Sequence, residues 1–230
     1  MNFLQLVQRL HRRTSSSGAV PVTLANQIED VQRKIDWVNE AWMEIQEERN
    51  NWNWMRNSTS FPTVSGQANY TLAQIQSTGV NFSNFGNWDT DTFRNYNTSA
   101  GANSENLMSV IPYESWRDVY QFGGTRNARS RPCEFTVMPD SGIGLGPTPE
   151  VGYTITAEYF TSALEMSADT DTPSLPLQFH MAIVYKAMMF YGVSEAALEV
   201  YEEGKSLYDK MMRRVEWNQL PAMQFAGALA

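Results

Sequence analysis

Apolar side chains recur between residues 24 and 45 in alternating steps of four and three. This heptad spacing is typical of a long amphipathic helix that buries one stripe against a core. Two further large apolar residues, Trp37 and Met43, lie outside the stripe and predict a second contact, either with a sheet or with another subunit. The stripe itself consists of Leu24, Ile28, Val31, Ile35, Val38, Trp42 and Ile45.

Three other segments carry a helical pattern. Residues 3–10 have apolar side chains at i, i+3, i+4 and i+7, which predicts a short amphipathic helix. Residues 177–191 predict another helix, and Ser194 is a favourable N-cap for the one that follows. In that last helix the acidic residues come early and the basic residues late, which is the order that the helix dipole favours.

The middle of the chain has a different character. From residue 57 to about residue 160, Asn, Ser, Thr and Gly are frequent and apolar residues come in short alternating bursts, which predicts β-structure. Residues 60–64 and 69–75 are expected to form a hairpin. Turns of the type PDSG and PTPE separate three further strands and predict a meander of residues 133–138, 142–146 and 153–160.

Together these patterns predict an α+β fold, built as a mainly antiparallel bundle of about four helices with a β-rich hairpin and meander insertion between the second and third main helices. Within the insertion, the polar stretch 81–106 is long enough to be a protruding loop. We expect N-terminal helices in residues 1–56, the insertion in 57–160, C-terminal helices in 161–216 and an extended tail in 217–230.

The balance of charge limits the classes of partner. The 230 residues include 17 Lys and Arg against 25 Asp and Glu, which gives a net charge of -8. Such a chain is poorly suited to gripping phosphates with a basic surface, so nucleic acid is not expected as a bound ligand. DNA that only passes an acidic wall is compatible with this charge.

Cysteine content and hydropathy bear on the compartment. The single cysteine, Cys133, leaves no pair for an internal disulfide, so a reducing compartment is expected. Polar residues interrupt the apolar N-terminal run, so it is expected to be neither a signal peptide nor a membrane span. No other stretch reaches about 18 apolar residues. We expect a soluble protein with no membrane partner.

Candidate catalytic and metal-binding residues are few. The two histidines, His11 and His180, lie in different predicted helices, and neither has a second ligand at HxxxH or HExxH spacing. The paired carboxylates that begin at Asp89 and Asp169 start a calcium-loop pattern but do not continue it. The glycine clusters lack the Lys-Ser/Thr of a phosphate cradle. The sequence therefore predicts no catalytic residue, no metal and no cofactor.

The tryptophans allow two interpretations. The segment WNWMR at residues 52–56, with Trp88 and Trp116, could form a platform that stacks on sugars or bases. The interpretation that we favour is a hydrophobic plug where the long helix meets the sheet. Trp52 follows Ile45 by seven residues and so continues the heptad.

The helix predicted at residues 177–191 is apolar on two sides. At about 100° per residue, Phe179, Ile183 and Phe190 fall nearly opposite the arc that carries the other apolar residues. A helix with two apolar sides needs cover on both. The β layer or a neighbouring subunit could supply it, and we assign these three residues, with Trp37 and Met43, to subunit packing.

Four groups of residues carry a resemblance to a known family. They are FLQLVQRLHRR, then QIEDVQRKIDWVNEAWMEIQ with WNWMR, then CEFTVMPDSGIGLGPTP with YTITAEYF, and LPLQFHMAIVYKAMMFYG with the helix after it. Together they resemble the head-to-tail adaptor, or connector, proteins of tailed bacteriophages. The resemblance covers roughly residues 3–56 and 107–216, and the stretch 81–106 fits it least well.

The resemblance implies a structural role in the virion without catalysis. Adaptors of this kind form a ring, usually of twelve copies, that is assembled in the host cytoplasm and binds beneath the portal protein. The ring extends the DNA channel, through which genomic DNA passes without specific binding, and it carries a downstream tail or nozzle protein.

Two sets of residues follow from the resemblance. We expect the C-terminal segment to dock on the portal through Trp217, Leu220, Pro221, Met223, Phe225 and Leu229. We expect the 81–106 loop to meet the next tail component through Phe82, Phe85, Trp88, Phe93 and Tyr96.

Two alternatives stay open at this point. One is a tail-tube or tail-completion ring protein. The other, of a different class, is a carbohydrate-binding or hydrolase module of the virion, which would use the Trp-rich segments and the Asn/Thr-rich β region. Against the hydrolase stands the lack of a convincing pair of catalytic acids.

Overall fold

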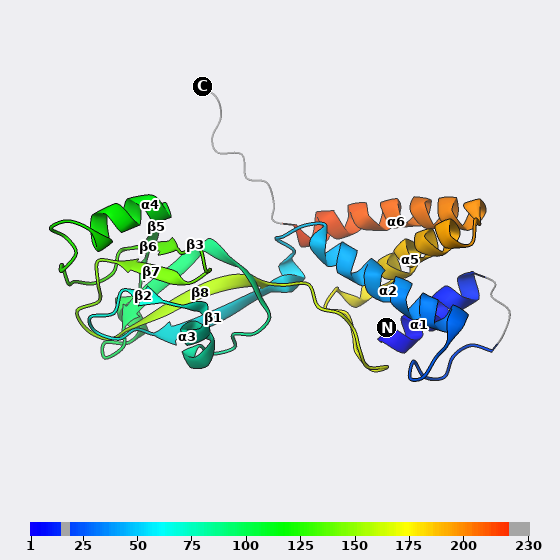
Figure 1. The fold of residues 1–230 in the computed structure, drawn as a ribbon, viewed down its shortest axis with the longest axis horizontal. Helices are drawn as coiled ribbons and strands as arrows, with labels where there is room; N and C mark the ends of the chain where they lie inside the picture. The colour runs from blue at the N-terminus through cyan, green and yellow to red at the C-terminus, as the bar shows by residue number, and fades with distance from the viewer. Residues whose placement is uncertain (15–18, 221–230) are drawn as a thin grey trace, which may run out of the picture. The chain divides into compact units, whose positions relative to one another are not determined.

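The computed structural model describes residues 1–14 and 19–220. The chain divides into two compact units, each with a core of its own (Figure 1). The first, Met1–Met55 with Ala163–Ala230, is called the helical unit below, and the second, Arg56–Ser162, is called the sheet unit. The predicted α+β class is confirmed, with six α-helices and two four-stranded sheets in the described part of the chain.

Four long helices form the helical unit. They are α1 (Phe3–Arg13), α2 (Glu29–Glu47), α5 (Met181–Ser194) and α6 (Leu198–Gln219), with short helical turns η1 (Asn53–Met55) and η4 (Leu177–Phe179). Helix α5 packs against the other three (Figure 1). Because α5 is enclosed by three neighbours, its crowded apolar sequence is explained within one chain.

The central position of α5 corrects two of the predicted subunit contacts. Ile183 is fully buried and Phe179 nearly so, both in the core of their own helical unit. Side chains without exposed surface cannot pack against a neighbouring subunit. The close approach of α6 also depends on Gly204, because a Cβ atom there would lie 3.0 Å from the Cβ of Met188.

Helix α2 begins later than the heptad pattern predicted. Asn26 has a φ of 55°, in the left-handed region, so a regular helix cannot run through it. Ile28 occupies the N-cap position and is 76% exposed. From Ile35 onward the prediction holds, since the stripe residues Ile35, Val38, Trp42 and Ile45 are all buried.

The start of α6 also differs from the prediction. Ser194 is the last residue of α5, and the N-cap position of α6 belongs to Ala197. Ala196, with a φ of 52°, makes the turn between the two helices. A Ser in an N-cap-like sequence context therefore ends one helix here instead of starting the next.

The sheet unit contains two sheets. Sheet A has the order β1 (Arg56–Pro62), β8 (Tyr153–Thr161), β3 (Phe85–Asn97) and β4 (Asn106–Leu107), and all its pairs are antiparallel. Sheet B has the order β2 (Asn69–Tyr70), β7 (Ile143–Gly146), β6 (Glu134–Val137) and β5 (Ser109–Val110), with only β5 and β6 parallel. The short helices of this unit are α3 (Leu72–Thr78), α4 (Tyr113–Trp116), η2 (Ala102–Ser104) and η3 (Arg117–Gln121).

The predicted strand pairing is only partly right. The hairpin β6–β7 forms as expected, but β8 leaves the predicted meander and pairs with β1 and β3. The first predicted hairpin is wrong, because its two segments belong to different sheets. Its second half becomes α3, which starts with a capping box between Thr71 and Gln74. The insertion is therefore more elaborate than a hairpin and a meander.

The predicted protruding loop at 81–106 is wrong. Half of it is the 13-residue strand β3, which lies between β8 and β4 in sheet A. Two register shifts, between Phe85 and Asn87 and between Asp89 and Arg94, interrupt its pairing with β8. Such bulges break the strict alternation of inward and outward side chains, so the sequence pattern of a strand is lost. Phe82, Trp88 and Phe93 are buried in the core of the sheet unit.

Candidate functional site

His180 is held from both sides of its ring. Its Nε2 atom lies 2.7 Å from the carbonyl oxygen of Leu175, to which it donates, and its Nδ1 atom lies 2.7 Å from the amine of Met1. The residue is 1% exposed, and burial lowers its pKa below the ordinary value. Burial also lowers the pKa of the Met1 amine. Both ring nitrogens are engaged in structural contacts, so this histidine is part of the packing of α5.

The second histidine belongs to a buried polar group between α1 and α2. The amino group of Lys34 is fully buried, forms a salt bridge with Asp30 and lies 3.4 Å from Nδ1 of His11. The other ring nitrogen of His11 has no hydrogen-bond partner in the described part of the chain. Among residues 1–14 and 19–220, no group of three His, Cys, Asp or Glu side chains could hold a metal ion.

The carboxylates near residue 170 fasten the segment that enters the C-terminal helices. Asp169 accepts a hydrogen bond from the backbone N–H of Leu24 at 3.0 Å. Asp171 accepts from the backbone N–H groups of Ala168 and Ser167, at 2.8 and 2.7 Å, and these bonds lower the pKa of its carboxyl group. These two acids therefore stabilise the local backbone of this segment.

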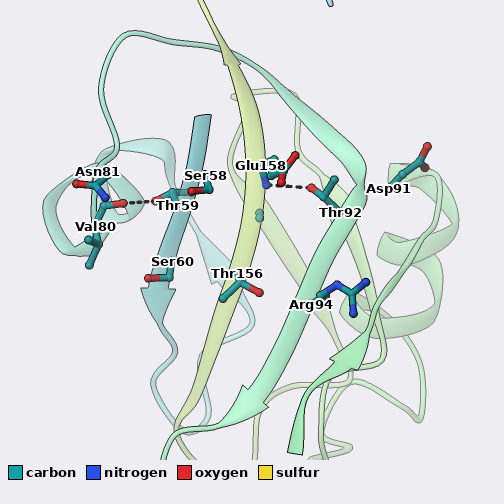
Figure 2. Close-up of a pocket in the computed structure, with 11 residues that line it drawn as sticks. Ser58, Thr59, Ser60, Val80, Asn81, Asp91, Thr92, Arg94, Thr156 and Glu158 are labelled. Atoms are coloured by element: carbon teal, nitrogen blue, oxygen red, sulfur yellow. Dashed lines mark hydrogen bonds between the residues drawn. The ribbon is translucent and has the colours of Figure 1, made fainter. Parts of the chain in front are cut away.

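The open face of sheet A presents a polar surface to which three strands contribute. Figure 2 shows Ser58 and Ser60 of β1, Thr156 and Glu158 of β8 and Arg94 of β3 around one depression. Its volume is about 430 Å³. The register places Ser58 opposite Glu158 and Ser60 opposite Thr156, which brings these side chains to one face. Thr92 adds a cross-strand bond, accepting from the backbone N–H of Glu158 at 2.9 Å (Figure 2).

Most charges on this face are matched within the chain, whereas exposed Asp91 forms no salt bridge in the described structure. Arg56 forms salt bridges with Asp89 and with Glu158, the latter at 2.6 Å, and Arg94 lies 3.6 Å from Glu105. No nucleophile in the depression is paired with a base among the residues that line it. The arrangement suits a polar contact surface better than a reaction centre.

A second surface lies at the C-terminal end of α6. Trp217 is 92% exposed, and Leu177, the first residue of the η4 turn, is 71% exposed. A depression of about 440 Å³ lies beside them, lined by Gln178, Phe179, Arg213, Arg214, Trp217 and Asn218. Of the predicted docking residues, Trp217 and Leu220 belong to the described part of the chain. Pro221, Met223, Phe225 and Leu229 lie outside it.

The remaining predicted contact residues are only partly available. Trp37 is half-buried and packs edge-on against Tyr191, with ring centroids 5.8 Å apart. Met43 and Phe190 are also half-buried. Among the residues predicted to meet the next tail component, Phe85 and Tyr96 are half-buried. The other three, Phe82, Trp88 and Phe93, are buried in the core of the sheet unit.

The tryptophans do not form a stacking platform. Trp52, Trp88 and Trp116 are all buried. The indole of Trp52 stacks on Trp54 at 4.4 Å, and its Nε1 donates to the carbonyl oxygen of Ile45 at 3.0 Å. Trp52 is therefore part of the core of the helical unit, and Trp52, Trp88 and Trp116 are not available for stacking on sugars or bases.

One basic segment was not predicted from the sequence. Arg126 and Arg129 are exposed in a segment where three arginines occur within six residues. The net charge of -8 for the whole chain does not reveal this local excess of positive charge. Counting charge in short windows, as well as over the whole chain, would have found it.

A family model described as SU10 adaptor protein matches residues 1–225. The chain belongs to this family. The SU10 adaptor match confirms the resemblance to phage head-to-tail adaptors. It also includes residues 81–106, which fitted the resemblance least well by pattern alone. No curated protein matches the chain. No helix in residues 1–14 and 19–220 is long and apolar enough to cross a membrane.

Proposed function

We propose that this chain is the subunit of a non-catalytic ring that joins the head of a phage particle to its tail. The observation that carries the proposal is the SU10 adaptor match, which spans both units of the chain. In this proposal, twelve copies sit beneath the portal protein in the virion and extend the channel through which the genome passes. The subunits are made and assembled in the host cytoplasm.

The surface at the end of α6 is the proposed portal contact. An indole that is 92% exposed leaves a large apolar area in water, and tryptophan is among the residues that dominate binding at protein interfaces. The adjoining depression is lined by Trp217 together with Gln178, Arg213, Arg214 and Asn218. A large aromatic side chain with polar and charged groups around it is common at protein contacts.

The open face of sheet A is the proposed contact for the downstream tail or nozzle protein. It presents hydroxyl groups, and Arg56 and Glu158 are already paired with each other, so a partner can cover these two charges without leaving them unpaired. The sequence predicted this contact in a protruding loop at 81–106. Because that stretch contains β3, a strand of sheet A, we assign the contact to the open face of the sheet instead.

The charge of the subunit supports passage of DNA without binding. Twelve copies at -8 each would carry a charge of about -96. A channel with a negative wall repels the phosphate backbone and lets the duplex slide.

Mass photometry of the full chain, with and without its portal ring, tests the proposal. We expect a complex that contains portal and about twelve copies of this chain. A chain that ignores the portal and binds glycans would contradict the adaptor function. Stacked rings or tubes that form without the portal would favour a tail-tube or tail-completion protein.

A further inference from the structure

The sheet unit contains six arginines and no lysine. Arg56, Arg94 and Arg117 each form a salt bridge with a carboxylate of the same unit. Arg131 is held by the side chain and carbonyl oxygen of Asn95, both at 2.7 Å. The described residues provide no salt bridge for Arg126 or Arg129, both of which are exposed.

These two arginines border one depression. Arg126 lines it, together with Gly66, Gln67, Asn69 and other residues, and its volume is about 450 Å³. The guanidinium of Arg129 lies against Gly66, since a Cβ atom on that glycine would be 3.3 Å from Nη2 of the arginine. Gly66 has a φ of +83°, a conformation that suits glycine.

The backbone and the walls of the depression are fixed by hydrogen bonds. The N–H of Ser130 donates to the carbonyl oxygen of Thr148 at 3.1 Å, which holds the arginine segment beside the lining residue Thr148. Gln67 donates to the carbonyl oxygen of Asn69 at 2.8 Å. The walls therefore consist largely of polar groups in set positions.

The carboxylate of Glu134, next to this depression, already accepts a hydrogen bond from within the chain. Glu134 accepts a hydrogen bond of 2.7 Å from the hydroxyl of Tyr120, which lines the depression. Burial, together with this bond, raises the pKa of Tyr120, so the phenol stays protonated and keeps donating. Glu134 forms no salt bridge with either arginine in the described structure, which leaves both guanidinium groups open to an external anion.

We propose that this depression binds carboxylate side chains of a neighbouring copy of the same chain. Guanidinium groups match carboxylates in shape and charge, and two of them can bind a pair of acids. The inference rests on the ring put forward above. It adds a specific contact between neighbouring subunits.

Charge complementarity supports a second copy as the partner. The helical unit has 11 Lys and Arg against 16 Asp and Glu, a net charge of -5, and the sheet unit has 6 against 9, a net charge of -3. Like-charged copies repel each other, so a ring needs local opposite pairs at its interfaces. The helical unit offers nine exposed acids that form no salt bridge in the described structure: Glu29, Asp36, Glu40, Glu47, Glu48, Glu165, Glu199, Glu202 and Asp209.

DNA is the less favoured partner. Affinity for a duplex grows with the number of phosphates that the protein neutralises. Two free cations on a unit of net charge -3 offer few such contacts. Two carboxylates from a neighbouring subunit would match the two arginines one to one.

Cross-linking in the assembled complex tests the proposal. The variant R126K/R129K keeps both charges and supplies amines that a carbodiimide couples directly to carboxylates in contact. We would mix chains labelled with 14N and 15N, assemble them on the portal ring, and identify the coupled peptides by mass spectrometry. The expected product joins the 126–129 segment of one chain to an Asp or Glu of a chain with the other label.

Charge removal gives an independent measurement on the same complex. We expect R126Q/R129Q to raise the concentration at which half of the chains assemble by about tenfold. The control R9Q/R12Q removes the same charge from exposed arginines of α1 and should change it much less. Equal effects of the two variants would overturn the proposal.

Other outcomes separate the remaining possibilities. A ring that forms normally but couples only to portal, only within one chain, or not at all would overturn the proposal and leave the adaptor function intact. Unchanged assembly of R126Q/R129Q with weaker retention on a DNA column at low salt would make phosphate the ligand. If the unaltered chain forms no ring on the portal, the proposed function itself fails, and this inference fails with it.

Discussion

The ring of Phe93 in β3 stacks on the ring of Phe135 in β6, with centroids 4.0 Å apart and planes at 21°. The two strands belong to different sheets, and both side chains are fully buried. This pair therefore joins sheet A to sheet B in the centre of the sheet unit. A strand that looked like a surface loop in the sequence supplies half of it.

Replacing Phe93 with Ala should lower the stability of the sheet unit by about 3–5 kcal/mol, because a buried ring is lost and a cavity remains. Urea unfolding, combined with hydrogen exchange of the β3 and β6 amides, measures the change. Leu107→Ala is the matched control, since this neighbouring side chain in β4 is exposed. A loss below about 1 kcal/mol for Phe93→Ala would contradict the role of the pair.

The salt bridge of Lys34 should respond differently to the loss of each partner. Asp30→Asn leaves a fully buried ammonium without its carboxylate, and we expect a loss of about 3–5 kcal/mol. Lys34→Met leaves a carboxylate that water can reach, so the loss should be much smaller. Chemical denaturation of both variants gives the comparison. Equal losses would show that Asp30 does not compensate the buried charge.

Acid should destabilise the helical unit through His180. Burial lowers its pKa in the folded chain, so the unfolded chain takes up the proton first as pH falls. The stabilising contribution is therefore complete above the ordinary histidine pKa of about 6.5 and is lost as pH falls through and below that value. The free energy of unfolding of His180→Gln, measured between pH 8 and 5, should fall less steeply than that of the unaltered chain. If the free energies of unfolding of the two chains fall in parallel with pH, His180 is not the source of the acid destabilisation.

The exposed indole of Trp217 should be required for attachment to the portal. We expect Trp217→Ala to weaken binding by about 2 kcal/mol, or about 30-fold, while the helical circular dichroism stays unchanged. Leu198→Ala is the control, since it removes another exposed apolar side chain at the opposite end of α6. Deletion of residues 219–230 should abolish attachment without loss of helix. Normal binding by both the Trp217 variant and the deletion would place the portal contact elsewhere.

The open face of sheet A should tolerate substitution in the free chain. Thr156→Arg adds a long charged side chain to the depression without touching the core, so stability should change by less than about 0.5 kcal/mol. Binding of the downstream tail protein should fall strongly in a pull-down on assembled portal complexes. The same substitution at exposed Ser77 on α3 serves as the control. A Thr156 variant that recruits the tail protein normally would exclude this face as the contact.

Patterns within short segments of the sequence were enough to predict the classes of structure and the family. Local periodicity identified the helices around Phe3–Leu10 and Ile35–Ile45, because each buries one stripe that repeats with the helical turn. Alternation identified β8, whose residues Tyr153, Ile155, Ala157 and Tyr159 all face inward. The stretches that led to the adaptor resemblance come from these regular elements.

Features that depend on contacts between distant segments became visible in the folded chain alone. The bulges in β3 hid a central strand from any two-residue pattern, and β1 pairs with β8, which lies about one hundred residues away in the chain. Whether Ile183 faced a subunit or its own core depended on α1, α2 and α6 closing around α5. Likewise, Arg126 and Arg129 could be recognised as unpaired only once the partners of the other arginines were known, because a salt bridge is a property of neighbours in space.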